Sequence, residues 1–377
     1  MEFVVAVFGL ALLAFVLADA FQTLVVPRSA NSNLRLTALF FTHGWALWRW
    51  AGRRIAAGNK REAHLWTFGP LSLITLMALW ATLLVFAFGM LQWGVHSPIR
   101  GPEARPGFWS DVYLSGTTLF TLGYGDVTPL NPIGRCISVT EAGVGFGFLA
   151  IVIGYLPVLY AGFSKREVAI SMLDARAGSP PTAFELLRRH ASEKLGPCAL
   201  GELLAEWERW AADLLESHLS YPTLVFYRSQ HDRQSWLASM TCLLDTCALV
   251  IAGVGGPANR QARLTFAMCR HALIDLTLIL NTKPSFSETR RLSQEQAAAL
   301  VARLTEVTVP FEHPVDFDEL NRLAGMYEPY IATLAEFLVV DIPPWCPDNN
   351  VLLDNWEASA WEAHNAADSD WVLHPRQ

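Results

Sequence analysis

The chain has 377 residues, of which 52% are hydrophobic and only 17% are charged, a balance typical of membrane proteins rather than soluble enzymes. Residues 1–165 hold 11 Lys and Arg against 7 Asp and Glu, whereas residues 166–377 hold 17 against 28. This shift predicts a membrane part followed by an acidic soluble part. The acidic part argues against nucleic acid as a partner, because phosphate binding needs a basic face.

The six cysteines and ten histidines form no C-x-x-C pair and no spacing typical of a zinc site. We therefore expect structural thiols in a reducing cytoplasm and no bound cofactor. The sequence also lacks a nucleophile and base, a set of metal ligands or a phosphate loop at suitable spacing. We expect no enzymatic activity.

The first predicted element is an apolar segment over residues 3–26, long enough to span a bilayer core. Asp19 lies near its far end, where it can reach the interface or a protein partner. A basic connector over 27–64 follows. Its apolar stretch 36–48 is too short to span and predicts an amphipathic helix at the headgroup level, although the sequence leaves open whether 36–58 lies in the interface.

Two further spans are predicted over residues 65–93 and 133–163, separated by a short helix over 108–120 that Ser110 is expected to cap. A helix too short to span, followed by a loop, is typical of a re-entrant segment. Such backbone is tolerated at membrane depth only where it is buried in protein or lines a water-filled path. The basic connector predicts that the amino terminus and the re-entrant loop lie outside and that everything after residue 163 lies inside.

The loop itself reads Thr121-Leu122-Gly123-Tyr124-Gly125-Asp126. Four such segments would make a narrow tube of backbone carbonyl oxygens and threonine hydroxyls that can replace the water shell of a potassium ion. Glycines suit this tube because carbonyls that point inward from successive residues require conformations that a Cβ would penalise. The motif therefore predicts an ion path.

Residues 109–160 resemble bacterial two-helix potassium channels in the order of pore helix, selectivity filter and inner helix. The resemblance implies an all-α membrane fold and a homotetramer, since each chain carries one filter segment. It also implies that Asp126 lies at the pore mouth, where four copies would concentrate cations. The residues that the resemblance assigns to the K⁺ filter are Thr121, Leu122, Gly123, Tyr124 and Gly125.

The surroundings of the filter depart from the family pattern. Phe120 stands where the family often has threonine, and Thr117 stands where some members have a glutamate behind the filter. Glu141, inside the third span, is a candidate for filter support from behind, together with Thr117. A packing role for Glu141 with a hydroxyl partner such as Thr117 or Thr118 is the alternative.

The third span carries Gly143, Gly145 and Gly147, which weaken helix rigidity. By the resemblance Gly145, with Gly143 beside it, marks a gating hinge. Close helix packing through small residues is the alternative. Pro157, nearer the cytoplasmic end, is expected to bend the helix or loosen its hydrogen bonding.

The remaining half predicts an all-α module of unassigned fold. Its Gly253-Val254-Gly255-Gly256 stretch lacks dinucleotide-binding spacing. The polar and aromatic segments 217–222 and 226–231 predict either a ligand pocket or an interhelical loop. The tail after residue 340 is expected to pack over the helices or over a neighbouring chain. Helices are expected near 182–194, 198–219, 231–253, 258–281, 294–307 and 316–340.

Two of those helices, around 236–254 and 264–280, are apolar enough to be mistaken for spans, but the charges inside them favour buried helices of a soluble bundle. The expected domains are 1–64, 65–163 and 164–377: a first span with its connector, a pore domain and a cytoplasmic helical domain.

The sequence thus predicts a potassium-selective, passively conducting homotetramer in the prokaryotic inner (plasma) membrane. The expected partners are the lipid bilayer and, in the cytoplasmic part, an unidentified small-molecule or ion regulator. A weakly selective cation channel, or a membrane sensor or scaffold with a silent pore, is the alternative.

Overall fold

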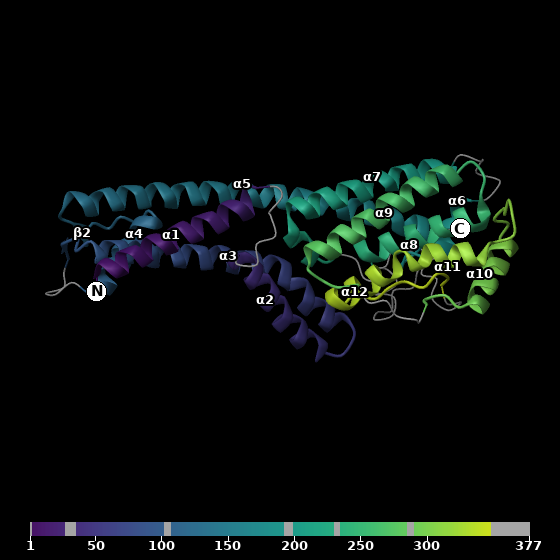
Figure 1. Ribbon diagram of the computed structural model, residues 1–377, viewed down its shortest axis with the longest axis horizontal. Helices are drawn as coiled ribbons and strands as arrows, with labels where there is room; N and C mark the ends of the chain where they lie inside the picture. The colour runs from purple at the N-terminus through teal and green to yellow at the C-terminus, as the bar shows by residue number, and fades with distance from the viewer. Residues whose placement is uncertain are drawn as a thin grey trace, which may run out of the picture. The chain divides into compact units, whose positions relative to one another are not determined.

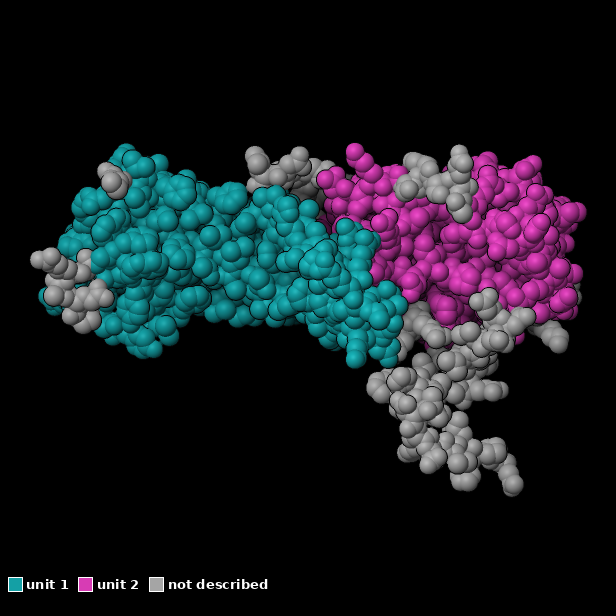
Figure 2. All heavy atoms as spheres, turned by 90° about the horizontal axis from the view of Figure 1, so that it is seen from below, with its two compact units in different colours: residues 1–161 teal, residues 162–377 magenta. Residues whose placement is uncertain are grey.

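The computed structural model describes residues 2–26, 35–101, 107–191, 199–229, 234–284 and 290–347. The chain divides into two compact units, residues 1–161 and 162–377, which are coloured separately in Figure 2. The described part is almost entirely helical, as expected. Of the predicted features, Arg28, Cys198, the end of the 226–231 segment and the tail tryptophans Trp356, Trp361 and Trp371 lie outside the described residues.

Unit 1 begins with α1 (Glu2–Leu24), α2 (Leu36–Arg53) and α3 (Asn59–Gly94), and α1 lies along α3 (Figure 1). Small residues permit this close approach. A Cβ on Gly94 would lie 2.5 Å from the backbone nitrogen of Ala6, and one on Gly9 would lie 2.9 Å from the carbonyl oxygen of Ala87. Helices packed through small residues gain van der Waals contact without help from water. The first span is therefore an integral layer of unit 1.

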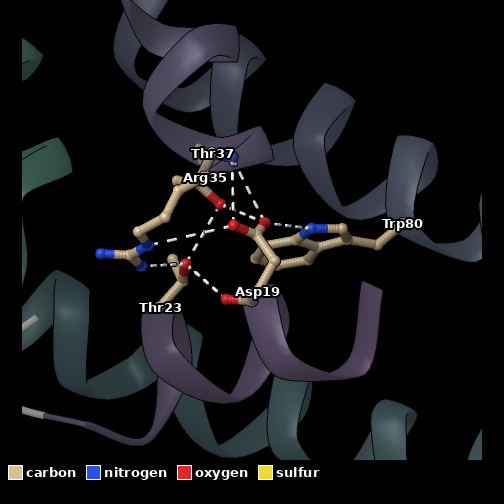
Figure 3. A network of polar contacts seen from close by, with 5 residues as sticks. All are labelled: Asp19, Thr23, Arg35, Thr37 and Trp80. Carbon is tan, nitrogen blue, oxygen red and sulfur yellow. Dashed lines mark hydrogen bonds and ion pairs between the residues drawn. The ribbon is translucent and has the colours of Figure 1, made fainter. Parts of the chain in front are cut away.

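Asp19 joins α1, α2 and α3 through a buried polar network (Figure 3). Its carboxylate accepts hydrogen bonds from the Thr37 hydroxyl at 2.6 Å and the Trp80 indole at 2.9 Å. The Thr37 backbone N–H, in the first turn of α2, also donates to it, so the carboxylate complements a helix N-terminus. Arg35 lies 4.0 Å away and donates to Thr23. Asp19 therefore finds its partners within its own chain.

An apolar cluster surrounds this network and reaches the pore helix. Trp80 packs edge to face against the partly buried Phe148, and Trp80 belongs to a core in which Leu119, the last residue of the pore helix, is also buried. Large aliphatic and aromatic side chains of this kind supply most of the burial energy of a fold. The cluster is built around Val16, Ala20, Leu76, Trp80, Leu84 and Leu119.

The re-entrant segment comprises β1 (Ile99–Arg100), α4 (Phe108–Leu119) and β2 (Thr128–Pro129). The two short strands pair antiparallel, with Ile99 opposite Pro129, which the sequence did not predict. The expected cap at Ser110 is wrong. The helix begins two residues earlier, and Ser110 lies in its first turn and accepts a hydrogen bond from the Gly107 N–H at 3.2 Å.

The third apolar helix, α5 (Pro132–Ala177), is continuous over 46 residues and runs past residue 163, where the predicted span ends. Pro157 lies inside it without ending it. A proline within a helix removes one hydrogen bond, but packing can hold the helix together across it. Residues 132–161 of α5 belong to unit 1 and its last turns to unit 2.

Unit 2 is a helical bundle in which side chains cap several helices. Thr182 caps α6, Ser235 caps α8, Ser293 caps α10 and Asp316 caps α11, each by accepting a backbone N–H of the first turn. The elements are α6 (Ala183–His190), α7 (Ala199–Ser220), η2 (Pro222–Phe226), α8 (Trp236–Leu249), η3 (Val250–Val254), α9 (Asn259–Ile279), α10 (Gln294–Glu306), α11 (Phe317–Gly325) and α12 (Glu328–Leu338).

The single helix expected over 316–340 is wrong, because the chain forms α11 and α12 with a break at Tyr327. Pro329 explains the break. It lacks an N–H, and its ring would clash with the carbonyl of Gly325 if the helix continued. Pro329 instead lies in the first turn of α12, where a proline is tolerated.

The helix α8 and the π-helical turn η3 meet the length and composition of a membrane span, yet the whole of this segment is buried inside the protein. Asp245 in its middle is paired with Arg291 through two hydrogen bonds of 3.0 Å and accepts a third from Tyr327 at 2.5 Å. Of the expected tail packing, the described part is seen at Trp345, whose side chain is buried and whose carbonyl accepts the Phe184 N–H. These contacts support the interpretation of α8 as the core of a bundle.

Candidate functional site

The loop that leaves the pore helix α4 is anchored to the end of that helix. The carbonyl oxygen of Thr117 accepts the N–H groups of Leu122, at 2.8 Å, and Gly123, at 3.2 Å, and the Thr118 carbonyl accepts that of Thr121. The carbonyls at a helix end need such partners. The N–H groups at the start of the filter are therefore turned back toward α4.

Three residues of the loop at alternate positions have a positive φ: Thr121 at 58°, Gly123 at 55° and Gly125 at 74°. Alternation between left-handed and right-handed backbone turns successive peptide groups to the same side, so that their carbonyls can line one path. Glycine adopts the left-handed region without penalty, whereas Thr121 is a β-branched residue for which it is uncommon. The hexapeptide has the backbone that a carbonyl-lined tube requires.

All residues from 121 to 126 are exposed in the single chain, and the Tyr124 ring is 71% exposed. At the Asp126 end of the loop, the hydroxyl of Tyr113 on α4 donates to the Asp126 carboxylate at 2.9 Å, and the Val127 N–H donates to its other oxygen. The candidate mouth residue Asp126 is thus held in place by the pore helix. The candidate filter residues lie together on a surface that the chain itself does not cover.

Glu141 is fully buried on α5 and contacts the pore helix at Ser115. The Ser115 hydroxyl lies at hydrogen-bond distance from the Glu141 carboxyl and 2.8 Å from the carbonyl oxygen of Val85 on α3. The expected hydroxyl partners Thr117 and Thr118 are wrong, since both donate to the Leu114 carbonyl. Ser115 lies two residues before Thr117 on the same helix, and nothing in the sequence indicated that its side chain would face α5.

The structure distinguishes between the two candidate hinge glycines. A Cβ on Gly145 would lie 2.2 Å from the carbonyl oxygen of Leu119, whereas a Cβ on Gly143 or Gly147 would meet nothing within 4 Å. Both Gly143 and Gly145 lie in unbroken helix. Gly145 is therefore required by the close approach of α5 to the end of the pore helix, and hinging at either position stays a prediction.

The face of α5 away from α3 and α4 is apolar and exposed in the single chain. Val139, Phe146 and Ile153 recur every seven residues with exposures of 74%, 69% and 62%. An exposed apolar face of this length marks contact with lipid or with other protein chains. This face and the exposed loop are the surfaces that an assembly of several chains or the lipid would have to cover.

The segments 217–222 and 226–231, predicted as a ligand pocket or an interhelical loop, lie against the side chain of Arg166 on α5. Its guanidinium donates to the carbonyls of Leu224, at 3.0 Å, and Tyr227, at 2.6 Å, and lies 3.3 Å from the His218 ring. Burial, followed by the nearby Arg166 charge, lowers the pKa of His218 to about 3. The Leu214 carbonyl, 2.7 Å from His218 Nδ1, favours the tautomer with a proton there. These contacts favour the loop interpretation.

Within the described ranges, no group of three His, Cys, Asp or Glu side chains is placed to hold a metal ion. The carbonyls of residues 121–125 and the Thr121 hydroxyl stay the candidate groups for a passing cation, as predicted from the motif. Such a set of neutral oxygens can replace hydration water without binding the ion so tightly that it cannot leave.

Residues 73–160 match the family model described as ion channel. Over this segment the chain is therefore similar to the ion channel family. The matched part of the channel domain begins within α3, includes α4 and the filter, and ends within α5. The matched segment includes residues 109–160, on which the resemblance to the family rests, whereas α1, α2 and unit 2 lie outside it.

Similar proteins occur in Bacillus and Geobacillus. The chain is 29% identical over 229 residues to an uncharacterized membrane protein, YdjJ, of Bacillus subtilis, covering 57% of this chain and 61% of that protein. It is 43% identical over 58 residues to Protein LctB of Bacillus caldotenax (15% and 42%) and 50% identical over 42 residues to Protein LctB of Geobacillus stearothermophilus (11% and 31%). The chain thus spans less than two thirds of each relative. No solved structure shows a significant match.

Proposed function

We propose that the chain forms a potassium-selective channel in which four copies surround one axis and conduct K⁺ passively. The alternating positive φ values at 121, 123 and 125 carry this proposal, because they turn carbonyl groups toward one side of an exposed loop. A ring of such carbonyls can replace the hydration shell of K⁺. The Asp126 side chains would then surround the mouth and attract cations.

The exposed surfaces of unit 1 support a tetramer. One chain supplies one filter strand and leaves it open, and the apolar face of α5 beside it is equally uncovered. Closed rotational symmetry covers such self-complementary surfaces with copies of the same chain. A filter of this kind is completed by four strands.

Basic residues support an orientation with the amino terminus and filter mouth outside and unit 2 in the cytoplasm of a prokaryotic cell. Six of them lie in or beside α2 and at the start of α3, and Lys165 and Arg166 follow the third span. Basic residues near span ends favour the cytoplasmic side. In α2 they stand beside Trp48 and Trp50, residues typical of the headgroup level. The six are Arg35, Arg49, Arg53, Arg54, Lys60 and Arg61.

In this proposal unit 2 assembles or gates the channel. The helix α5 carries the candidate pore face and then continues into unit 2, where Arg166 fixes it to η2 and α7. A ligand that altered these contacts would act directly on the inner helix. We infer that any regulator is a small molecule or an ion, and that nucleic acid takes no part.

Flux from liposomes tests the proposal. Purified full-length protein should release K⁺ down its gradient and exclude Na⁺, and cross-linking in the membrane should give a tetramer. Gly123→Ala should abolish K⁺ selectivity, because alanine is disfavoured at a φ of 55°. Gly147→Ala is the control, since its Cβ would meet nothing within 4 Å.

Other outcomes would contradict the proposal. Equal permeability to Na⁺ and K⁺ would show a weakly selective cation channel. A tetramer without flux across a panel of pH, calcium and nucleotide conditions would favour a sensor or scaffold with a silent pore.

A further inference from the structure

The Ser115 hydroxyl has two oxygen neighbours, the Val85 carbonyl and the Glu141 carboxyl. Ser115 Oγ lies 2.8 Å from the carbonyl oxygen of Val85 and at hydrogen-bond distance from Glu141 Oε1. A serine hydroxyl has one proton to donate, a backbone carbonyl can only accept, and an ionised carboxylate can only accept. With Glu141 ionised, one of the two contacts would bring two acceptors together without a proton.

A proton on Glu141 satisfies both contacts at once. Glu141 then donates to Ser115 Oγ, and Ser115 donates to the Val85 carbonyl, so each short oxygen pair contains one proton. The second Glu141 oxygen, Oε2, is buried and has no hydrogen-bond partner among the described residues. An unpaired oxygen of a neutral acid is far less costly to bury than that of an ionised carboxylate.

Among the described residues of α3, α4 and α5, none brings a positive charge to Glu141 that would stabilise an anion. Residues 65–94 of α3 contain no titratable side chain, and Gln92 on that helix donates to the Gly134 carbonyl and to Ser138. On α5 the nearest charged side chain is Arg135, which is exposed and bonds to the Pro129 carbonyl.

On α4 the titratable neighbour is Asp111. Ser115 contacts Glu141, and four residues later on both helices Leu119 lies against Gly145, so α4 and α5 run side by side in the same direction. Asp111, four residues before Ser115, therefore lies one turn away on the same face of α4. Asp111 is buried, and its Oδ1 also has no hydrogen-bond partner in the described part of the chain. A second acidic group nearby would oppose a negative charge on Glu141.

We propose that Glu141 is a neutral carboxylic acid that donates through Ser115 to the backbone of α3, and so fixes the pore helix from behind. The relay joins α5, α4 and α3 two residues before Thr117, whose carbonyl holds the N–H groups of Leu122 and Gly123. Glu141 is thus a positioning residue for the filter. Its role in ion selection rests on the proposed function, whereas its protonation does not.

Infrared spectroscopy of the purified full-length protein in lipid tests the protonation directly. The difference between wild type and Glu141→Gln should show the loss of a carboxylic acid carbonyl band, and Ser115→Ala should shift that band by removing its acceptor. Asp111→Asn is the matched control and should retain the Glu141 band. A difference spectrum with only ionised carboxylate bands would overturn the proposal, whether or not the protein conducts.

Flux measurements test the positioning role by rescue. Gln can donate to Ser115 as a neutral acid does, so Glu141→Gln should keep the K⁺ over Na⁺ ratio. Glu141→Ala and Ser115→Ala should lower it about tenfold, as expected for loss of one buried hydrogen bond, and Ser115→Thr should restore it. If Glu141→Gln behaved like Glu141→Ala, the negative charge would be the active feature and the proposal would be wrong. It would be equally wrong if Glu141→Ala left the ratio unchanged.

Discussion

The helices α5 and α8 are both apolar enough to cross a membrane, yet they are used in opposite ways. Of the most apolar window of α5 only 11% is buried inside the chain, whereas the window over α8 and η3 is 100% buried. The α8 helix has its own protein around it and a paired Asp245 inside it. Unit 1 thus leaves apolar surfaces exposed that lipid and, in the proposed tetramer, other copies would cover, while unit 2 encloses its own core.

The strongest test of this comparison is Asp245→Ala. It would remove the nearer carboxylate of the largely buried Arg291 guanidinium and leave only the longer pair with Glu328 at 3.8 Å; breaking a buried ion pair costs about 3–5 kcal/mol. If α8 spanned lipid, removal of the acid would instead favour its insertion. Thermal unfolding of the purified full-length protein, followed by circular dichroism, measures the difference. Asp213→Ala, which breaks the exposed pair with Lys165, is the control and should change little.

Gly145→Ala tests a tightly filled contact between α5 and the pore helix in unit 1. The new methyl group would meet the Leu119 carbonyl, and overpacking of this kind costs about 1–3 kcal/mol. We expect lower thermal stability in detergent micelles and a displaced pore helix. Gly143→Ala should be neutral or stabilising, because alanine favours helix and meets nothing there. If both variants abolished opening without loss of stability, hinging rather than packing would explain the glycines.

Acid should destabilise unit 2 through His218. Its pKa in the folded protein is about 3, below its ordinary value of 6.5, so the unfolded chain binds the proton more readily. The contribution to stability is complete above pH 6.5 and is lost as pH falls toward 3, amounting to about 2 kcal/mol between pH 7 and pH 5. In His218→Gln the unfolding midpoint should change less between pH 7 and pH 5 than it does in the wild type. His271→Gln, at an exposed site, should leave the slope unchanged.

Trp80→Phe should have the smallest effect. It keeps an aromatic ring in the core of unit 1 but removes the indole N–H that donates to Asp19, at a cost of about 1 kcal/mol. The Thr37 donors remain. Thermal unfolding in detergent measures the change, with Trp66→Phe at an exposed site of α3 as control. An effect as large as that of Asp245→Ala would show that unit 1 depends on a polar core as strongly as unit 2 does.

The local pattern predicted the channel domain well because its signals are contiguous. The span lengths, the short helix between them and the Gly123 and Gly125 motif each lie within a few residues of sequence. The break before α12 also has a local signal, Pro329, but the prediction of a single helix over 316–340 did not take it into account.

Long-range contacts could not be predicted from the sequence. Ser115 meets Glu141 only because α4 and α5 run in step, and Asp19 meets Thr37 and Trp80 only once three helices are packed. The continuation of α5 beyond residue 163 was missed because apolar character ends there while helical structure does not. Hydropathy indicates whether a helix segment suits lipid or water, and it does not indicate where the helix ends.

The pairing of β1 with β2 has a consequence for biogenesis. The filter is tied at one end to the Thr117 carbonyl and at the other by the strand pair and by the Leu130 N–H, which donates to the Pro98 carbonyl at 2.8 Å. All these ties lie within one chain. If the chain assembles as proposed, each newly inserted subunit can therefore shape its own loop before it meets a second copy, and assembly would dock loops that are already formed.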